Sequence, residues 1–342
     1  MARTGGWRRA GSRGRFRYYD ARGNRIRDPA KLERIELLRI PPAWRDVWIS
    51  PRSNAKLQAT GIDAGGRRQY LYHAEFRRRQ EDEKFDKLVR FAEKLPGLRA
   101  TMAEHMALAD LTPERVCAIA VSLINLGWFR VGSEEYARKY RSFGITTLRK
   151  SHVKIRGSRI TFAFPGKRRI WVRTALVDAE LASALRELQT LHGGGRLFRY
   201  RVDGELTNLT ARRLNEYIQV CMDEEFSAKD FRTWGGTLMA AITLAEHGPP
   251  ETEAEAKRTV AAVMRTVGEK LGNTPTVARA SYVSPAVVEQ FLDGRTLEDF
   301  RPRHLRVLRA RETALDPEEQ ALLSLLRSWR IRRGQAERRE AA

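Results

Sequence analysis

The sequence contains few cysteines and no long apolar run, and these absences exclude several classes of protein. Two cysteines, Cys117 and Cys221, occur in 342 residues, each inside a helical apolar pattern. This is typical of core residues rather than of a disulfide framework or a metal cluster. No apolar run approaches the roughly 20 residues of a membrane span, and the basic start lacks the apolar segment of a secretory signal. The sequence therefore predicts a cytoplasmic protein with no membrane partner.

Cofactor motifs are missing as well. The chain has no glycine-rich phosphate-binding loop and no carboxylates at metal-ligand spacing. We therefore expect a function that requires no cofactor, no metal ion and no nucleotide.

Positive charge, in contrast, is abundant. The chain has 64 lysines and arginines against 42 aspartates and glutamates, which gives a formal net charge of +22 at pH 7. An excess of this size indicates a polyanionic partner. A membrane surface is the competing partner, but basic residues alternate with acidic ones along most expected helices, and no strongly amphipathic basic segment stands out.

The order of the expected elements indicates two domains in an α+β fold. Short strands are expected at 16–19, 44–49 and 66–72, followed by a charged helix over 73–94 that ends at Leu95-Pro96-Gly97. We expect a small β-rich N-terminal domain, residues 1–90, and a larger, mainly helical domain, residues 91–342. The second domain includes a β-hairpin region at 152–173 and helices at 174–191, 207–222, 227–247, 251–271 and 317–342.

Four side chains of the second domain stand in unusual local settings: Arg130 after an apolar helix, Lys167 at a hairpin tip, Arg232 among aromatic and small residues, and Tyr282 near a helix end. A tyrosine hydroxyl can attack a phosphodiester when fixed cations neutralise the charge on the phosphate oxygens and a proton donor protects the leaving alkoxide. Together the four side chains have the chemistry of a phosphoryl-transfer site without metal.

Each of these residues also has an ordinary structural interpretation. An isolated tyrosine is far more often a half-buried structural residue than a nucleophile. Arginines in so basic a chain are usually surface charges, and a lysine at a hairpin tip usually serves solubility. The small and aromatic neighbours of Arg232 favour close packing over a solvated face.

The local sequences around these residues resemble the type IB DNA topoisomerases, most closely the compact bacterial and poxviral members. The resemblance extends from about residue 15 to about residue 300, and its motifs follow one another in the same order as in the family. They lie at 126–133, 142–148, 166–167 and 229–235. It implies an enzyme that relaxes positive and negative supercoils in double-stranded DNA. Cleavage of one strand through a 3′-phosphotyrosyl intermediate, followed by religation, would need neither ATP nor metal.

The resemblance also implies a role for each candidate residue. Tyr282 is the expected nucleophile, and Arg130 and Arg232 are expected to stabilise the pentacoordinate transition state. Lys167 is the expected general acid for the leaving 5′ oxygen. Lys229, one helical turn before Arg232, is expected to support that proton transfer.

Asn273 departs from the nuclear and poxviral members, which carry histidine at this position, whereas bacterial-type members can carry asparagine. An amide can donate a hydrogen bond to a non-bridging oxygen but cannot carry charge. We therefore expect an oxyanion contact that depends less on pH near neutrality. The alternative is that Asn273 serves only as a helix cap.

Candidate DNA contacts in the first domain lie on the strand expected at 66–72. In the poxviral relatives a matching Gln-Tyr-x-Tyr stretch faces the DNA, which makes Gln69, Tyr70 and Tyr72 candidate contacts. Strand alternation places the two tyrosines on one face and Gln69 on the other, and ordinary sheet patterning explains the same residues. Arg67 and Arg68 are candidate phosphate binders.

Two rival functions stay open. A tyrosine recombinase shares the covalent chemistry and the Arg-Lys-Arg-Tyr order, but usually shows His-x-x-Arg where this chain has Lys229 to Arg232. A non-catalytic, basic DNA-binding protein would bind DNA without any covalent adduct. Nothing in the sequence resembles an obligate dimer seam, so we expect a monomer, associated with the bacterial nucleoid.

Overall fold

The computed structural model describes residues 5–12, 14–301 and 314–340, without the side chains of residues 78–82, 84, 337 and 340. The chain divides into two compact units, Met1–Lys84 and Phe85–Ala342, and each unit has its own hydrophobic core. The boundary expected between residues 90 and 91 lies within helix α2 (Ala74–Met106), which begins in the first unit and continues into the second.

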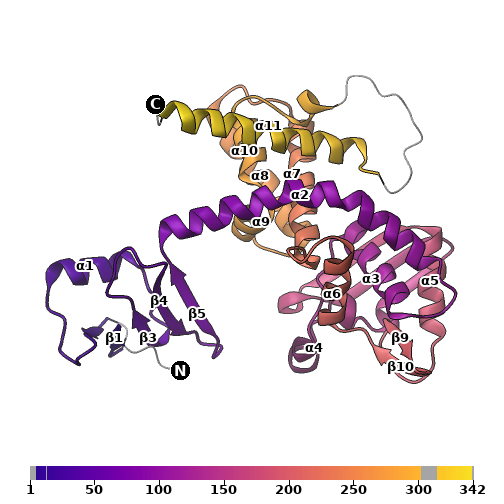
Figure 1. Ribbon diagram of the computed structural model, residues 1–342, viewed down its shortest axis with the longest axis horizontal. Coiled ribbons are helices and arrows are strands. Elements are labelled where there is room, and N and C mark those ends of the chain that lie inside the picture. Colours follow the sequence, from indigo (N-terminus) through magenta and orange to yellow (C-terminus); the bar gives the residue numbers. More distant parts are fainter. Residues whose placement is uncertain (1–4, 13, 302–313, 341–342) are drawn as a thin grey trace. The chain divides into compact units, whose positions relative to one another are not determined.

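The first unit is built on a five-stranded antiparallel sheet with the strand order β2-β1-β3-β4-β5 (Figure 1). Its elements are β1 (Trp7–Ala10), β2 (Arg17–Tyr19), α1 (Pro29–Leu37), β3 (Arg45–Ile49), β4 (Leu57–Ile62) and β5 (Arg68–Tyr72). The sequence predicted β2, β3 and β5 but missed β1 and β4. At β4 the reason is local. Gly61 weakens the strand signal there, and a side chain at that position would meet the Trp44 ring at 2.7 Å, so the glycine permits close packing.

Helix α2 does not end at Leu95-Pro96-Gly97, so that prediction is wrong. The helix continues through Pro96 to Met106. Phe91, Leu95 and Leu98 are fully buried along one face of the helix. Burial of these side chains offsets the cost of an internal proline, about 3 kcal/mol.

The second unit is mainly helical, as predicted (Figure 1). Its helices after α2 are α3 (Pro113–Gly127), α4 (Glu134–Tyr140), α5 (Ala179–Thr190), α6 (Ala211–Cys221), α7 (Ala228–His247), α8 (Glu253–Leu271), α9 (Pro275–Tyr282), α10 (Pro285–Leu292) and α11 (Pro317–Glu340), with short 3-10 turns η1 (Ile145–Thr147), η2 (Lys150–His152), η3 (Lys167–Arg169) and η4 (Leu297–Phe300). Helix α7 contacts α8, α9, α10 and α11, so the C-terminal helices pack around it. The predicted α+β class is thereby confirmed.

Two strands, β8 and β10, occupy the first residues of segments that were predicted to be helices. The sheet β6-β7-β8 comprises Val153–Arg156, Arg159–Pro165 and Trp171–Val177, and a hairpin comprises β9 (Arg199–Val202) and β10 (Glu205–Asn208). The helices expected at 174 and 207 therefore begin later, after the N-caps Asp178 and Thr210. Pairing with a neighbouring strand decides these boundaries, and local periodicity does not report it.

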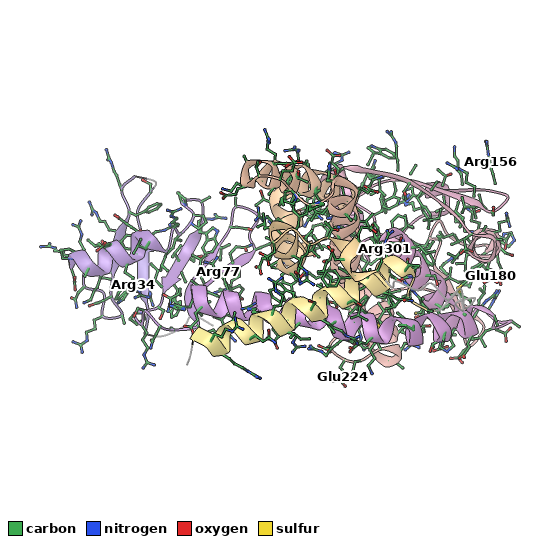
Figure 2. The ribbon with its side chains drawn as sticks, turned by 90° about the horizontal axis from the view of Figure 1, so that it is seen from above. Arg34, Arg77, Arg156, Glu180, Glu224 and Arg301 are labelled. Atoms are coloured by element: carbon green, nitrogen blue, oxygen red, sulfur yellow. The ribbon has the colours of Figure 1, made fainter. Side chains whose placement is uncertain are left out.

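Helix α11 runs alongside α2, which Figure 2 shows as a yellow helix beside a purple one. The Arg99 guanidinium donates two hydrogen bonds, at 2.7 and 2.8 Å, to the carboxylate of Glu319, which is 3% exposed. Arg327 pairs with Glu93 at 2.6 Å further along the two helices. Within the described ranges, no helix is long and apolar enough to cross a membrane.

Candidate active site

Arg130 and Arg232 converge on the C-terminal end of α8. Arg130 donates to the carbonyl oxygens of Leu271 at 3.1 Å and Gly272 at 3.2 Å. Arg232 donates to the same Leu271 oxygen at 2.7 Å and to the carbonyl oxygen of Trp128. The last carbonyls of a helix lack partners within the helix and carry the negative end of its dipole. The end of α8 therefore holds both guanidinium groups.

Two left-handed residues bring these carbonyls into position. Gly272, with φ +61°, is the C-cap of α8, and Trp128, with φ 49°, is the C-cap of α3. Glycine adopts this conformation without strain and is typical of the position after a helix. The Trp128 ring packs against Gly235 of α7, where a Cβ atom would lie 2.2 Å from its Nε1. The missing side chain at 235 thus lets the Trp128 segment approach α7, which carries Arg232.

The two arginines keep N–H groups for a ligand. A guanidinium has five N–H donors. The two bonds of Arg232 to carbonyls leave three N–H groups (5 − 2 = 3), including the buried Nε, for Tyr282 and a ligand. The bonds of Arg130 to Leu271, Gly272 and Asn273 leave two (5 − 3 = 2). In the described part of the chain both arginines bind neutral oxygens rather than carboxylates, so their charge is available to an anion.

Burial affects both guanidinium groups. Burial, and then the charge of Arg232, lowers the pKa of Arg130 to about 10. Burial also lowers the pKa of Arg232, which is 6% exposed. Two desolvated like charges at one site favour a bound anion, such as a phosphate.

Tyr282 is the last residue of α9 and is half-buried. The guanidinium carbon of Arg232 lies 5.1 Å from the centroid of its ring. Burial by itself would raise the pKa of Tyr282, but the charge and hydrogen bonding of Arg232, followed by the charges of Arg130 and Lys229, outweigh it. The pKa of Tyr282 therefore lies below its ordinary value of 10.0. This environment favours the phenolate, the nucleophilic form of the side chain.

Asn273 contacts Arg130 directly. Its Oδ1 accepts a hydrogen bond from Arg130 Nη2 at 2.7 Å, and its Nδ2 donates to the Leu271 carbonyl at 3.3 Å. One N–H of the amide is left for a ligand. The interpretation of Asn273 as the cap of α9 is wrong, because Thr274 is the N-cap and accepts from the Val277 amide at 3.3 Å.

Lys167 shares a pocket with both arginines. The pocket has a volume of about 300 Å³, and its lining includes Arg130, Arg232 and Lys167 but not Tyr282. Lys167 is exposed at the start of η3, between β7 and β8. Lys229 is exposed in the first turn of α7, and its charge acts on Tyr282. The fold thus places Lys167 in one pocket with the two arginines, and Lys229 where its charge acts on Tyr282.

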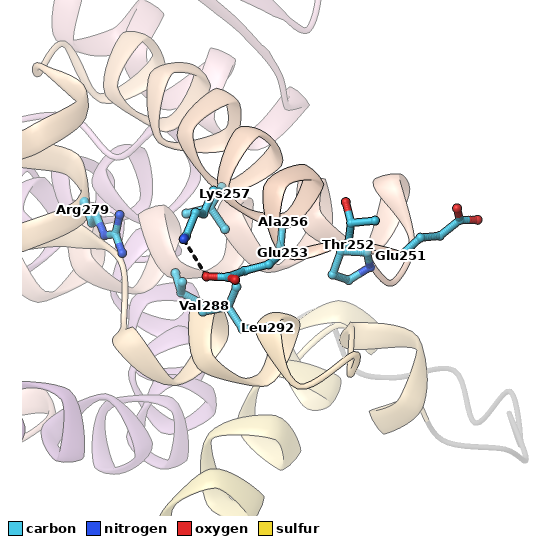
Figure 3. A pocket seen from close by; sticks show the side chains of 10 residues that line it. Glu251, Thr252, Glu253, Ala256, Lys257, Arg279, Val288 and Leu292 are labelled. Carbon is cyan, nitrogen blue, oxygen red and sulfur yellow. Dashed lines mark ion pairs between the residues drawn. The ribbon is translucent and has the colours of Figure 1, made fainter.

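A second pocket, of about 770 Å³, lies between α8, α9 and α10 (Figure 3). Lys257 pairs with Glu253 at its wall, and Val288 and Leu292 are among its apolar residues. It contains none of the candidate catalytic residues, so we do not assign it to the site. In the part of the chain that the structure covers, no three His, Cys, Asp or Glu residues are grouped so that they could hold a metal ion.

The candidate DNA contacts of the first unit lie on β5, an edge strand, except for Arg67, which directly precedes it. Tyr70 and Tyr72 are exposed on one face with Arg68, and their rings stack at 6.3 Å. Gln69 lies on the other face and donates to Asp63 Oδ2 at 2.8 Å. Arg67 forms an ion pair with the same carboxylate at 3.2 Å. Only Arg68 and the two tyrosines therefore share one exposed face.

The sequence prediction missed the main-chain part of the site. The carbonyls of Trp128, Leu271 and Gly272 orient both arginines, and no side-chain motif marks a carbonyl. One signal was present. A glycine directly after the apolar periodicity of α8 predicts a helix end, and therefore carbonyls without helical partners.

Comparison with known proteins covers most of the chain. Residues 73–295 match the family model described as eukaryotic DNA topoisomerase I, catalytic core, and residues 15–63 match the one described as bacterial DNA topoisomerase IB, N-terminal domain. The chain is 33% identical over 285 residues to DNA topoisomerase 1B of Acanthamoeba polyphaga mimivirus, covering 81% of this chain and 84% of the viral protein. It is 20% identical over 285 residues to DNA topoisomerase 1B of vaccinia virus (strain Western Reserve), covering 79% and 85%.

Proposed function

Because the chain belongs to the type IB DNA topoisomerases, we propose that it relaxes positive and negative supercoils in double-stranded DNA without ATP or a metal ion. The observation that carries the proposal is the pairing of Tyr282 with Arg232. A half-buried tyrosine with a lowered pKa lies beside a buried cation that keeps unused N–H donors. This contact supports the roles of Tyr282 as nucleophile and of Arg232 as a stabiliser of phosphate charge.

The proposed reaction begins when Tyr282 loses its phenol proton to solvent and the Oη of the phenolate attacks a phosphorus atom of one strand. The bond from phosphorus to the 5′ oxygen breaks, which leaves a 3′-phosphotyrosyl link and a free 5′ hydroxyl. Arg130, Arg232 and the Asn273 amide donate to the non-bridging oxygens as negative charge builds on them. Attack by the 5′ hydroxyl on the link reverses the reaction, and because the link conserves the bond energy, no ATP is needed.

Proton transfer falls to two lysines in this proposal. Lys167 protonates the leaving 5′ oxygen, and its exposed position in the pocket of the two arginines supports this role. Lys229 supports the transfer and also favours the phenolate of Tyr282 through its charge. The downstream duplex rotates while the strand is open.

DNA binding involves both units in this proposal, with the first acting as a DNA clamp. The exposed face formed by Arg68, Tyr70 and Tyr72 supports a DNA-contacting role for β5. Gln69 and Arg67 stay candidates of lower rank, because Asp63 already engages both. The formal charge of +22 supports binding along the phosphate backbone of nucleoid DNA, which weakens as salt rises. We propose that the protein acts as a monomer.

The test is relaxation of supercoiled plasmid in EDTA without ATP, with detergent added to trap covalent protein–DNA adducts. The wild-type chain should relax both signs of supercoil and form a 3′ adduct, and Tyr282→Phe should do neither. Tyr136→Phe, which removes the same atom from an exposed tyrosine of α4, is the matched control and should behave as wild type. An adduct without relaxation would indicate a recombinase, and DNA binding without either would indicate a non-catalytic protein.

A further inference from the structure

Helix α7 contacts the nucleophile at a second point beyond Arg232. One turn after Arg232, Gly236 and Thr237 pack against the junction between α9 and α10. This junction consists of Tyr282, the last residue of α9, and the extended residues Val283 and Ser284. The helix that carries the cation therefore also touches the main chain of the nucleophile.

The Thr237 hydroxyl joins both sides of the junction. Its oxygen lies 3.2 Å from the carbonyl oxygen of Tyr282 and accepts a hydrogen bond from the Ser284 amide at 3.1 Å. It also lies 2.7 Å from the Thr233 carbonyl one turn back in α7, so its single proton is shared between two carbonyls. Thr237 is fully buried and Ser284 is 1% exposed, so water does not replace these bonds.

Gly236 makes the close approach possible. A Cβ atom at this position would lie 2.7 Å from the Tyr282 carbonyl oxygen and 3.1 Å from the Tyr282 Cβ. The first distance is shorter than real Cβ contacts, and both atoms belong to the nucleophile itself. The Leu271 Cδ1 lies 3.1 Å from the same point, but it is the end of a flexible side chain and can move aside. A side chain at 236 would therefore act mainly on the main chain of Tyr282.

Helix α9 depends on such contacts for its position. It has eight residues, Pro275–Tyr282, which is too short to be stable without tertiary packing. Tyr282 lies at its C-terminal end, where helices fray. A fixed contact at the Tyr282 carbonyl is therefore needed to hold the hydroxyl in one place.

We propose that Gly236 and Thr237 are positioning residues, which fix the main chain of Tyr282 against the helix that carries Arg232. They thereby set the separation between the nucleophile and a cation that stabilises the transition state. The inference rests on the proposed role of Tyr282. A misplacement of about 1 Å can slow a reaction by about 10²-fold, so this contact should affect the cleavage rate rather than DNA affinity.

The first test is Thr237→Val, which keeps the branched shape and removes the hydroxyl. Single-turnover cleavage is measured on an oligonucleotide duplex in which the strand released with the free 5′ hydroxyl is short and dissociates, so that religation cannot occur. DNA affinity is measured separately in a Tyr282→Phe background. The cleavage rate should fall by about 10- to 100-fold with unchanged affinity. Thr237→Ser, which restores the hydroxyl, should recover most of the rate.

A matched control is Thr266→Val in α8, where the hydroxyl lies 3.4 Å from the Ala262 carbonyl of its own helix. This variant should cleave at the wild-type rate. Gly236→Ala is the second test and should slow cleavage at least as much as Thr237→Val. Gly97→Ala in α2, where a Cβ atom would meet nothing within 4 Å, is its control.

The outcomes separate this inference from the proposed function. Wild-type cleavage rates in Thr237→Val and Gly236→Ala would overturn the inference while leaving the function intact. A loss of cleavage that parallels a loss of DNA affinity, or failure of Thr237→Ser to recover the rate, would also overturn it. If the wild-type chain forms no adduct at all, the proposed function fails and the inference fails with it.

Discussion

Replacement of Arg232 with alanine removes a buried cation that faces the Tyr282 ring. The Arg232 side chain is 6% exposed, and its guanidinium carbon lies 5.1 Å from the ring centroid. The change also removes N–H donors that are free to meet a phosphate. We therefore expect it to slow strand cleavage far more than it weakens DNA binding.

The magnitude follows from this geometry. The guanidinium carbon lies 5.1 Å from the ring centroid, and two unit charges at about that separation interact by about 3 kcal/mol at an effective dielectric constant of about 20. Loss of one donor to a developing oxyanion costs about 2.7–4 kcal/mol in enzyme sites of this kind. These two values describe overlapping interactions and are not added. The cleavage rate should therefore fall by about 10²- to 10³-fold.

The assay is single-turnover cleavage at saturating protein, with DNA affinity measured in parallel. Arg232→Lys keeps the charge, but an ammonium cannot donate to the Trp128 and Leu271 carbonyls and to a phosphate in the same planar arrangement, so we expect an intermediate loss. Arg258→Ala removes the same charge from an exposed position of α8, about 20 Å along the helix from Leu271, and should cleave normally.

A fall of less than about tenfold in Arg232→Ala would refute the reasoning, because it would mean that the cation beside Tyr282 contributes little to the transition state. The same conclusion would follow if Arg258→Ala slowed cleavage as much. In that case the total charge of the protein, rather than its placement, would control the rate.

Three further predictions concern stability, pH and packing. Glu319→Ala should lower the free energy of unfolding by about 3–5 kcal/mol, because it leaves the Arg99 charge without its carboxylate partner. A loss below about 1 kcal/mol in urea unfolding would contradict this. Because the pKa of Tyr282 lies below 10.0, its ionised fraction and the cleavage rate should rise with pH through a value below 10, whereas a rise only above pH 10 would contradict the shift. Gly235→Ala would place a methyl group 2.2 Å from the Trp128 ring. The variant should stay folded but cleave more than about tenfold more slowly in a single turnover. A wild-type cleavage rate would show that this packing is not needed.

Much of the fold was predictable from the sequence. The predicted α+β class and type IB topoisomerase family are confirmed. Both could be predicted because strand alternation, helical periodicity and ordered motifs are local properties of the chain. The errors occur where distant contacts overrule local signals. Helix α2 continues through Pro96 because buried leucines hold it, and β4 forms although it contains Gly61.

The candidate side chains were also visible in the sequence, but their arrangement was not. Local motifs indicated Arg130, Arg232 and Tyr282, because unusual neighbours surround each of them. No local pattern could show that Arg130 and Arg232 share the Leu271 carbonyl, since the three residues lie on separate segments.

Most of the elements, the family of the chain and the candidate catalytic side chains could be read from the local sequence. The distances between those side chains depend on how the helices pack. The end of α8 orients both arginines, and α7 holds Arg232 at one point and the main chain of Tyr282 at another. Hydrogen bonds to main-chain carbonyls and the close approach of Gly236 depend on where the backbones lie, and packing of the helices fixes those positions.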